Sequence, residues 1–132
     1  MNFNSVEQAY ESLANYILAF IGSRSWDISS CSMRMVSSMA TSSQSLVYSG
    51  VKDELGGFEN NSTAMWNGLD AALFLRDNLL ATTGDRIWGL TFTLFPDGKF
   101  KIEYDYNKPE GYEETDETIS MDDAIKGLSD FN

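Results

Sequence analysis

The sequence predicts an α+β domain in which an antiparallel sheet of about four strands packs its apolar face against helices. Two segments with apolar residues at three- and four-residue spacings predict helices, and two pairs of alternating segments predict β-hairpins. The expected order is helix, two strands, helix, two strands and a short final helix. A length of 132 residues without a long repeat favours a single domain over residues 1–132.

The first helix is predicted over residues 6–21. Ser5 with Gln8 three residues later is a capping-box pattern, and Gly22 follows the last apolar position. The apolar face of this helix is expected to consist of Val6, Ala9, Tyr10, Leu13, Tyr16, Ile17, Phe20 and Ile21.

The first hairpin is predicted from a stretch that is poor in strong helix formers. Imperfect alternation from Trp26 to about Ser38 indicates a strand. Residues 39–43 are interpreted as a polar turn, and residues 44–49 as a second strand that ends at Gly50. Residues 51–61 contain a glycine pair and an asparagine pair, so we expect a loop there.

The second helix begins after Asn61 or Ser62, either of which can cap it, and ends before Gly84. Asp70, Arg76 and Asp77 are expected off its apolar face. That face is expected to consist of Met65, Trp66, Leu69, Ala72, Leu73 and Leu80.

The second hairpin is the clearest segment of the chain. Two alternating runs, 87–95 and 99–106, flank Pro96-Asp97-Gly98, which are typical turn residues. The expected core face contains Trp88, Leu90, Phe92, Leu94, Phe100, Ile102, Tyr104 and Tyr106. The expected polar face contains Thr91, Thr93, Lys99, Lys101, Glu103 and Asp105.

The end of the chain is strongly acidic. The net charge is −11, and the residues from Glu103 onward contribute ten acidic and two basic side chains. Residues 107–118 therefore predict a solvated loop. Ser120 is expected to cap a short last helix with an apolar side formed by Met121, Ala124, Ile125 and Leu128.

The composition excludes several kinds of chemistry. With no histidine and one cysteine, Cys31, the chain has neither a Ser-His or Cys-His nucleophile pair nor an intrachain disulfide. Cys31 is interpreted as a small core residue. The three tryptophans, Trp26, Trp66 and Trp88, are also expected to pack in the core rather than to form a stacking platform. Glu103 and Asp105 lie about 6 to 7 Å apart on one strand face, a spacing that fits glycoside hydrolysis. Their polar position disfavours the raised pKa that a catalytic acid needs. We therefore expect no catalytic residue, no cofactor and no metal.

The acidic balance limits the class of partner. It disfavours nucleic acid and anionic membranes, and it favours capture of a basic protein, although acidity can also serve solubility alone. The first residues lack a basic region followed by an apolar run, and the longest apolar stretch, 16–21, is too short to cross a bilayer. The expected location is the cytoplasm.

The second hairpin also resembles a known family. The run Gly98-Lys99-Phe100-x-Ile102-x-Tyr104-Asp105-Tyr106, preceded by an alternating strand that begins at Trp88, is similar to the YezG-like antitoxin or immunity family of bacterial toxin systems. The specific match covers about 20 residues, whereas the rest of the chain agrees only in the order of its elements. The stretch between Glu54 and Ser62 is shorter than the family usually has. The resemblance implies a cytoplasmic protein that binds and blocks a cognate toxin domain, often a nuclease.

The two lines of inference agree on a binding role, because a nuclease is basic where it holds RNA or DNA. The alternative is an acidic adaptor or chaperone-like module that binds a secreted effector without neutralising it. The residues expected to contact the partner are Glu103, Asp105, Glu110, Tyr112, Glu113, Glu114, Asp116 and Glu117.

Overall fold

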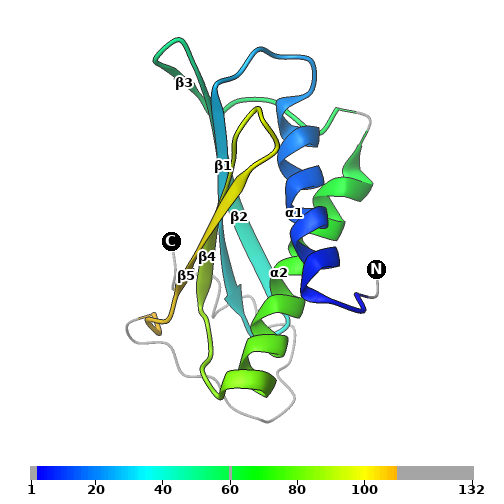
Figure 1. Cartoon of the computed structure of the whole chain (residues 1–132), viewed down its shortest axis with the longest axis vertical. Coiled ribbons are helices and arrows are strands. Elements are labelled where there is room, and N and C mark those ends of the chain that lie inside the picture. The colour runs from blue at the N-terminus through cyan, green and yellow to red at the C-terminus, as the bar shows by residue number, and fades with distance from the viewer. Residues whose placement is uncertain (1–2, 60, 110–132) are drawn as a thin grey trace, which may run out of the picture.

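A computed structural model describes residues 3–59 and 61–109 and confirms the α+β class. In these residues two helices lie on one face of a five-stranded antiparallel sheet of strand order β3-β2-β1-β4-β5 (Figure 1). The elements are α1 (Val6–Ile21), β1 (Ile28–Val36), β2 (Met39–Tyr48), β3 (Val51–Asp53), α2 (Ser62–Thr83), β4 (Gly89–Leu94) and β5 (Phe100–Asp105). The predicted final helix and most of the acidic loop fall in 110–132, outside the described residues. No helix in the described ranges is both long and apolar enough to cross a membrane.

The predicted turn at residues 39–43 is wrong, because those residues belong to β2. Val36 pairs with Met39, so the first hairpin turns through Ser37 and Ser38 alone. Ser37 has φ 51°, a positive value that two-residue hairpin turns require. Serine is not the usual residue for this conformation, and the sequence pattern therefore placed the turn too late.

A third strand forms where a loop was expected, which makes five strands rather than about four. Tyr48 pairs with Val51 across a turn of Ser49 (φ 51°) and Gly50 (φ 80°). Positive φ at both central residues is the requirement of the type I′ hairpin turn. The strand β3 is an edge of the sheet and spans only three residues.

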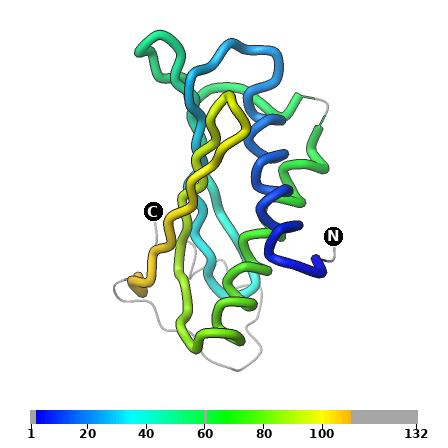
Figure 2. The backbone as a smooth tube through the Cα atoms, viewed as in Figure 1, coloured from blue at the N-terminus to red at the C-terminus, as the bar shows by residue number. Residues whose placement is uncertain are grey.

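The core lies between the helices and the inner face of the sheet. Cys31 is buried there, as expected from the sequence. The tip of the β4–β5 hairpin lies at the same end of the molecule as the end of α1 (Figure 2). The largest fully buried side chains include Leu13, Tyr16, Ile17, Phe20, Met35, Leu75, Ile87 and Phe92.

The predicted apolar face of α2 is wrong in two places. Trp66 is 60% exposed and Leu80 is 46% exposed. The helix instead buries Leu75 and a face of three small residues, Gly68, Ala71 and Ala72. The small residues let α2 approach α1 closely. Of the two possible caps, Asn61 is the cap, because its side chain accepts a hydrogen bond from Ala64 N–H at 3.3 Å.

The second hairpin is confirmed, but its predicted core face is only partly buried. Leu90, Phe92 and Leu94 of β4 are buried, whereas Phe100 is 44% and Tyr106 is 54% exposed. The reason is geometric: the helices pack mainly against each other and against β1, β2 and β4. The outermost strand β5 therefore extends beyond the helix layer.

Candidate protein-binding surface

Hydroxyl side chains line the sheet face opposite α1 and α2, which we call the far face. Because Ser29, Cys31 and Met33 of β1 are buried under the helices, the alternate residues Ser30 and Ser32 point to the far face. The register places Thr93 and Thr91 beside them on β4 and Ser45 and Ser43 beside them on β2. Because these side chains are small, this part of the far face is nearly flat.

The far face contains a shallow hollow of about 530 Å³. It lies at Gly89, which pairs with Arg34 on one side and with Asp105 on the other. A Cβ atom at Gly89 would stand 3.1 Å from the Met33 carbonyl oxygen and 3.5 Å from the Asp105 Cβ. Any larger residue at position 89 would therefore fill part of the hollow and press on the neighbouring strands.

Glu103 and Asp105 border this hollow and lie on the same face of β5, as the sequence predicted. Both residues are exposed. Glu103 Oε1 lies 2.8 Å from Lys101 Nζ, and this carboxylate raises the pKa of Lys101. Asp105 Oδ1 accepts a hydrogen bond from Asn107 N–H at 2.9 Å. These contacts hold two surface carboxylates in position without burying them.

The other predicted contact residues cannot be placed beside these two. Glu110, Tyr112, Glu113, Glu114, Asp116 and Glu117 lie outside the described residues. Glu103 and Asp105 are thus the two members of the predicted set that the structure brings together. Among the residues it describes, no group of three His, Cys, Asp or Glu side chains could hold a metal ion.

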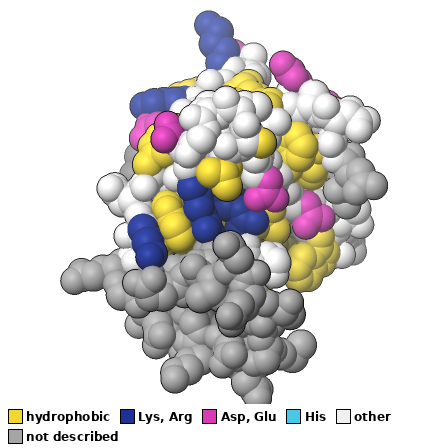
Figure 3. Space-filling view, turned by 90° about the horizontal axis from the view of Figure 1, so that it is seen from below, with side chains coloured by type: hydrophobic (Ala, Val, Ile, Leu, Met, Phe, Trp, Pro, Cys, Tyr) yellow, Lys and Arg dark blue, Asp and Glu magenta, His cyan; other side chains and the backbone are white. Residues whose placement is uncertain are grey.

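Charge is unevenly distributed along the chain. Residues 3–109 hold twelve acidic and eight basic side chains, whereas residues 110–132 hold eight acidic and one basic. Lys and Arg side chains gather near the middle of the face shown in Figure 3, with Asp and Glu side chains beside them. The described body is therefore only mildly acidic, and a partner that recognises negative charge must find it at particular places on its surface.

β5 carries a mainly aromatic row of side chains on its helix side. The alternating pattern placed this row in the core and did not reveal that it is partly exposed. Phe100, Ile102, Tyr104 and Tyr106 form this row, which is half-buried to exposed. Tyr10 of α1 braces it: the two hydroxyls of Tyr10 and Tyr104 are 3.1 Å apart, and the Tyr10 and Phe100 ring centroids are 5.4 Å apart. Burial is the main cause that raises the pKa of Tyr104, followed by its hydrogen bond to Tyr10.

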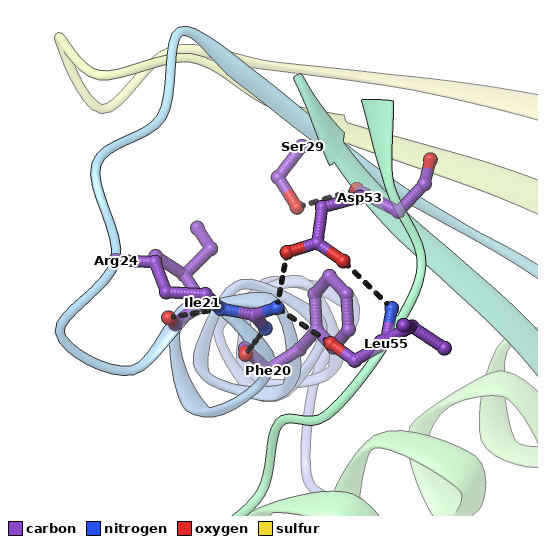
Figure 4. A network of polar contacts seen from close by, with 7 residues as sticks. Phe20, Ile21, Arg24, Ser29, Asp53 and Leu55 are labelled. Carbon is purple, nitrogen blue, oxygen red and sulfur yellow. Dashed lines mark hydrogen bonds and ion pairs between the residues drawn. The ribbon is translucent and has the colours of Figure 1, made fainter. Parts of the chain in front are cut away.

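The sequence also gave no sign of the network around Arg24 (Figure 4). Its guanidinium donates to the carbonyls of Phe20 and Leu55 and to the Asp53 carboxylate, the last at 3.1 Å. Asp53 also accepts a hydrogen bond from Leu55 N–H at 2.9 Å, and this bond, with help from Arg24, lowers the pKa of Asp53. The network ties the end of α1 to β3 and the segment after it.

Comparison with known proteins adds no relative. No family model matches the chain, and no curated protein matches its sequence. The likeness of residues 98–106 to YezG-like proteins therefore stays a prediction, and the case for a function depends on the surface itself.

Proposed function

We propose that this chain is an immunity protein, a stoichiometric inhibitor that binds a basic bacterial toxin domain and blocks it by occlusion. The observation that carries the proposal is the pair Glu103 and Asp105, exposed on one face of β5. Only four residues separate Asp105 from the most acidic stretch of the chain, which begins at Glu110. A strand with two exposed carboxylates, followed in the sequence by an acidic segment, offers negative charge to a basic protein.

The physical advantage of this arrangement is mainly kinetic. A negative surface steers a positive partner and can raise association rates by roughly 10- to 1,000-fold. A nuclease must be positive where it holds the phosphate backbone, so a negative protein can cover that region. Inhibition by coverage needs no catalytic residue, cofactor or metal in the inhibitor.

The braced hairpin supports the same proposal. Phe92 and Phe100 stack at 5.0 Å with ring planes 17° apart, and the ring of Tyr10 lies 5.4 Å from that of Phe100. These contacts hold β5 in one conformation, so the entropy lost on binding is small. We place the inhibitor in the cytoplasm, bound to protein rather than to nucleic acid or membrane.

Co-expression with the toxin domain encoded beside this chain tests the proposal. Cells that produce the toxin domain should regain growth when they also produce this protein, and the two purified chains should form a complex that lacks toxin activity. A complex that keeps full toxin activity would favour the adaptor instead. Failure to restore growth or to form a complex would contradict inhibition.

A further inference from the structure

The strand β5 ends the sheet and has one side without a neighbouring strand in the described part of the chain. Phe95 N–H donates to the Lys99 carbonyl at 2.9 Å, which fixes the phase of the β4–β5 ladder. Because hydrogen-bonded positions alternate along antiparallel strands, Lys101, Glu103 and Asp105 direct their backbone groups toward β4. Ile102 and Tyr104 direct their N–H and C=O groups away from the sheet, toward what we call the outer edge.

The side chains of β5 also alternate, between charged residues on the far face and apolar residues on the helix side. Glu103 and Asp105 stand on the far face, whereas Ile102 and Tyr104 stand on the helix side, half-buried beside Tyr10. An added strand shares both faces with its neighbour, and residues opposite each other lie on the same face. Lys101 shares the far face and pairs with Glu103 at 2.8 Å. A strand paired to this edge would therefore need basic side chains opposite Asp105 and Glu103, an acidic or neutral side chain opposite Lys101, and apolar side chains on the other face.

We propose that the outer edge of β5 receives an extended segment of the partner, in which apolar residues alternate with charged or polar ones, as an additional antiparallel strand. Its basic side chains would face Glu103 and Asp105, and its apolar side chains would cover Ile102 and Tyr104. This inference deepens the proposed function and rests on it for the identity of the partner.

Several observations favour this occupant. The edge strand is six residues long and contains no proline, so its backbone can pair throughout. Although Tyr10 of α1 contacts this row, Phe100 and Tyr106 stay 44% and 54% exposed and offer apolar area to an added strand. The charged residues on the far face restrict which strands can pair, since like charges directly opposite each other destabilise a pair.

The arrangement predicts which amides of the incoming strand pair with β5. In antiparallel pairing, a residue opposite Ile102 or Tyr104 exchanges both hydrogen bonds with it. These positions are apolar in the incoming strand, so its apolar residues carry the amides that bond to β5. The amides of its basic residues would point away from the sheet.

A peptide pair tests this prediction with the intact protein. The probe is the blocked peptide acetyl-Lys-Val-Lys-Val-Glu-Val-Thr-amide, whose two lysines face Asp105 and Glu103 and whose glutamate faces Lys101 in antiparallel pairing. It is compared with one version N-methylated at each valine and another N-methylated at the second lysine, the glutamate and the threonine. Valine methylation should abolish binding, whereas methylation of the three polar residues should change the dissociation constant by less than about threefold. Equal binding of the two methylated peptides, or equal loss, would overturn strand addition. The reverse preference would overturn the antiparallel orientation.

Hydrogen exchange gives an independent result on the same complex. The amides of Ile102 and Tyr104 should exchange at least tenfold more slowly with the unmethylated peptide at saturation, while those of Lys101 and Glu103 change little. Protection that appears with rising protein concentration alone would assign the edge to a second copy and contradict the proposal.

A charge exchange on β5 completes the test. The variant Glu103→Lys/Asp105→Lys should lose affinity for this peptide, by about two- to five-fold for each changed residue. It should gain affinity for the peptide with glutamate at every lysine position. If the peptide fails to pair but the cognate toxin is still neutralised, strand addition fails alone. If the peptide pairs but no toxin is blocked, the proposed function fails alone.

Discussion

Gly68 determines how closely α2 approaches α1, and its replacement by alanine should destabilise the protein. A Cβ at this position would lie 2.4 Å from Tyr16 Cδ2, 2.7 Å from its Cβ and 2.8 Å from its Cγ. Tyr16 is 1% exposed, and its hydroxyl bonds to Gln44 at 2.7 Å and to Ser42. The ring therefore cannot move aside without losing contacts on β2.

Two opposing effects set the size of the change. Alanine favours the helix over glycine by about 1 kcal/mol, whereas overpacking of a core costs about 1–3 kcal/mol. Displacing the Tyr16 hydroxyl from its partners adds about 1 kcal/mol. We therefore expect Gly68→Ala to lower the free energy of unfolding by about 1–3 kcal/mol.

Urea unfolding followed by tryptophan fluorescence measures this loss. Ala81→Gly, at an exposed position of the same helix, calibrates the propensity effect. Tyr16→Phe should cost about 1 kcal/mol alone and much less beside Gly68→Ala, because the displaced hydroxyl has already lost its partners. A Gly68→Ala protein as stable as the original would refute the close approach as a constraint.

Three other predictions concern pH and charge. Burial raises the pKa of Cys31 to about 12, whereas a thiol in the unfolded chain has a pKa of about 8.5. The unfolded chain therefore binds fewer protons in alkali, and the free energy of unfolding should fall as pH rises from about 9. This fall should be less steep in Cys31→Ala. Asp53→Asn should speed hydrogen exchange at Leu55 N–H near neutral pH. Because the pKa of Asp53 is lowered in the fold, the difference between the variant and the original protein should persist at about pH 4 and vanish only at lower pH. Glu54→Gln is the matched control, and an equal effect of both variants would contradict the Arg24 network. Reversing the charges of the acidic segment should slow association with the toxin domain and flatten its salt dependence, whereas an unaltered rate would show that this segment is not a contact. This last series changes Glu113, Glu114, Asp116 and Glu117.

Strong local signals made much of the fold predictable. The Ser5–Gln8 pattern caps α1 as expected: Gln8 N–H donates to Ser5 Oγ at 3.2 Å, and the Gln8 side chain accepts from Asn4 N–H at 2.7 Å. Pro96-Asp97-Gly98 turns the second hairpin, where Lys99 N–H donates to the Asp97 carboxylate at 2.9 Å. Local hydrogen bonds of this kind depend on neighbouring residues, so the sequence contains the necessary information.

Features that depend on distant packing were not predictable. Whether Trp66 or Gly68 faces the core depends on where α1 lies, and periodicity alone favoured the larger apolar residues. The exposure of Phe100 and Tyr106 depends on how far the helices extend over the sheet. For the same reason, the sequence predicted that Glu103 and Asp105 share a face, but it did not reveal the outer edge of β5 or the hollow at Gly89.

Binding of the toxin domain to two matched double variants tests the central proposal most directly. Glu103→Gln/Asp105→Asn and Glu7→Gln/Glu11→Gln each remove two exposed negative charges, from β5 and from α1 respectively. At about 0.2–1 kcal/mol for each exposed charge pair, the β5 variant should bind roughly 2- to 30-fold more weakly, with a smaller salt dependence. The α1 variant should bind nearly as well as the original protein. Equal loss in both variants would show that overall charge, rather than the carboxylates of β5, governs binding.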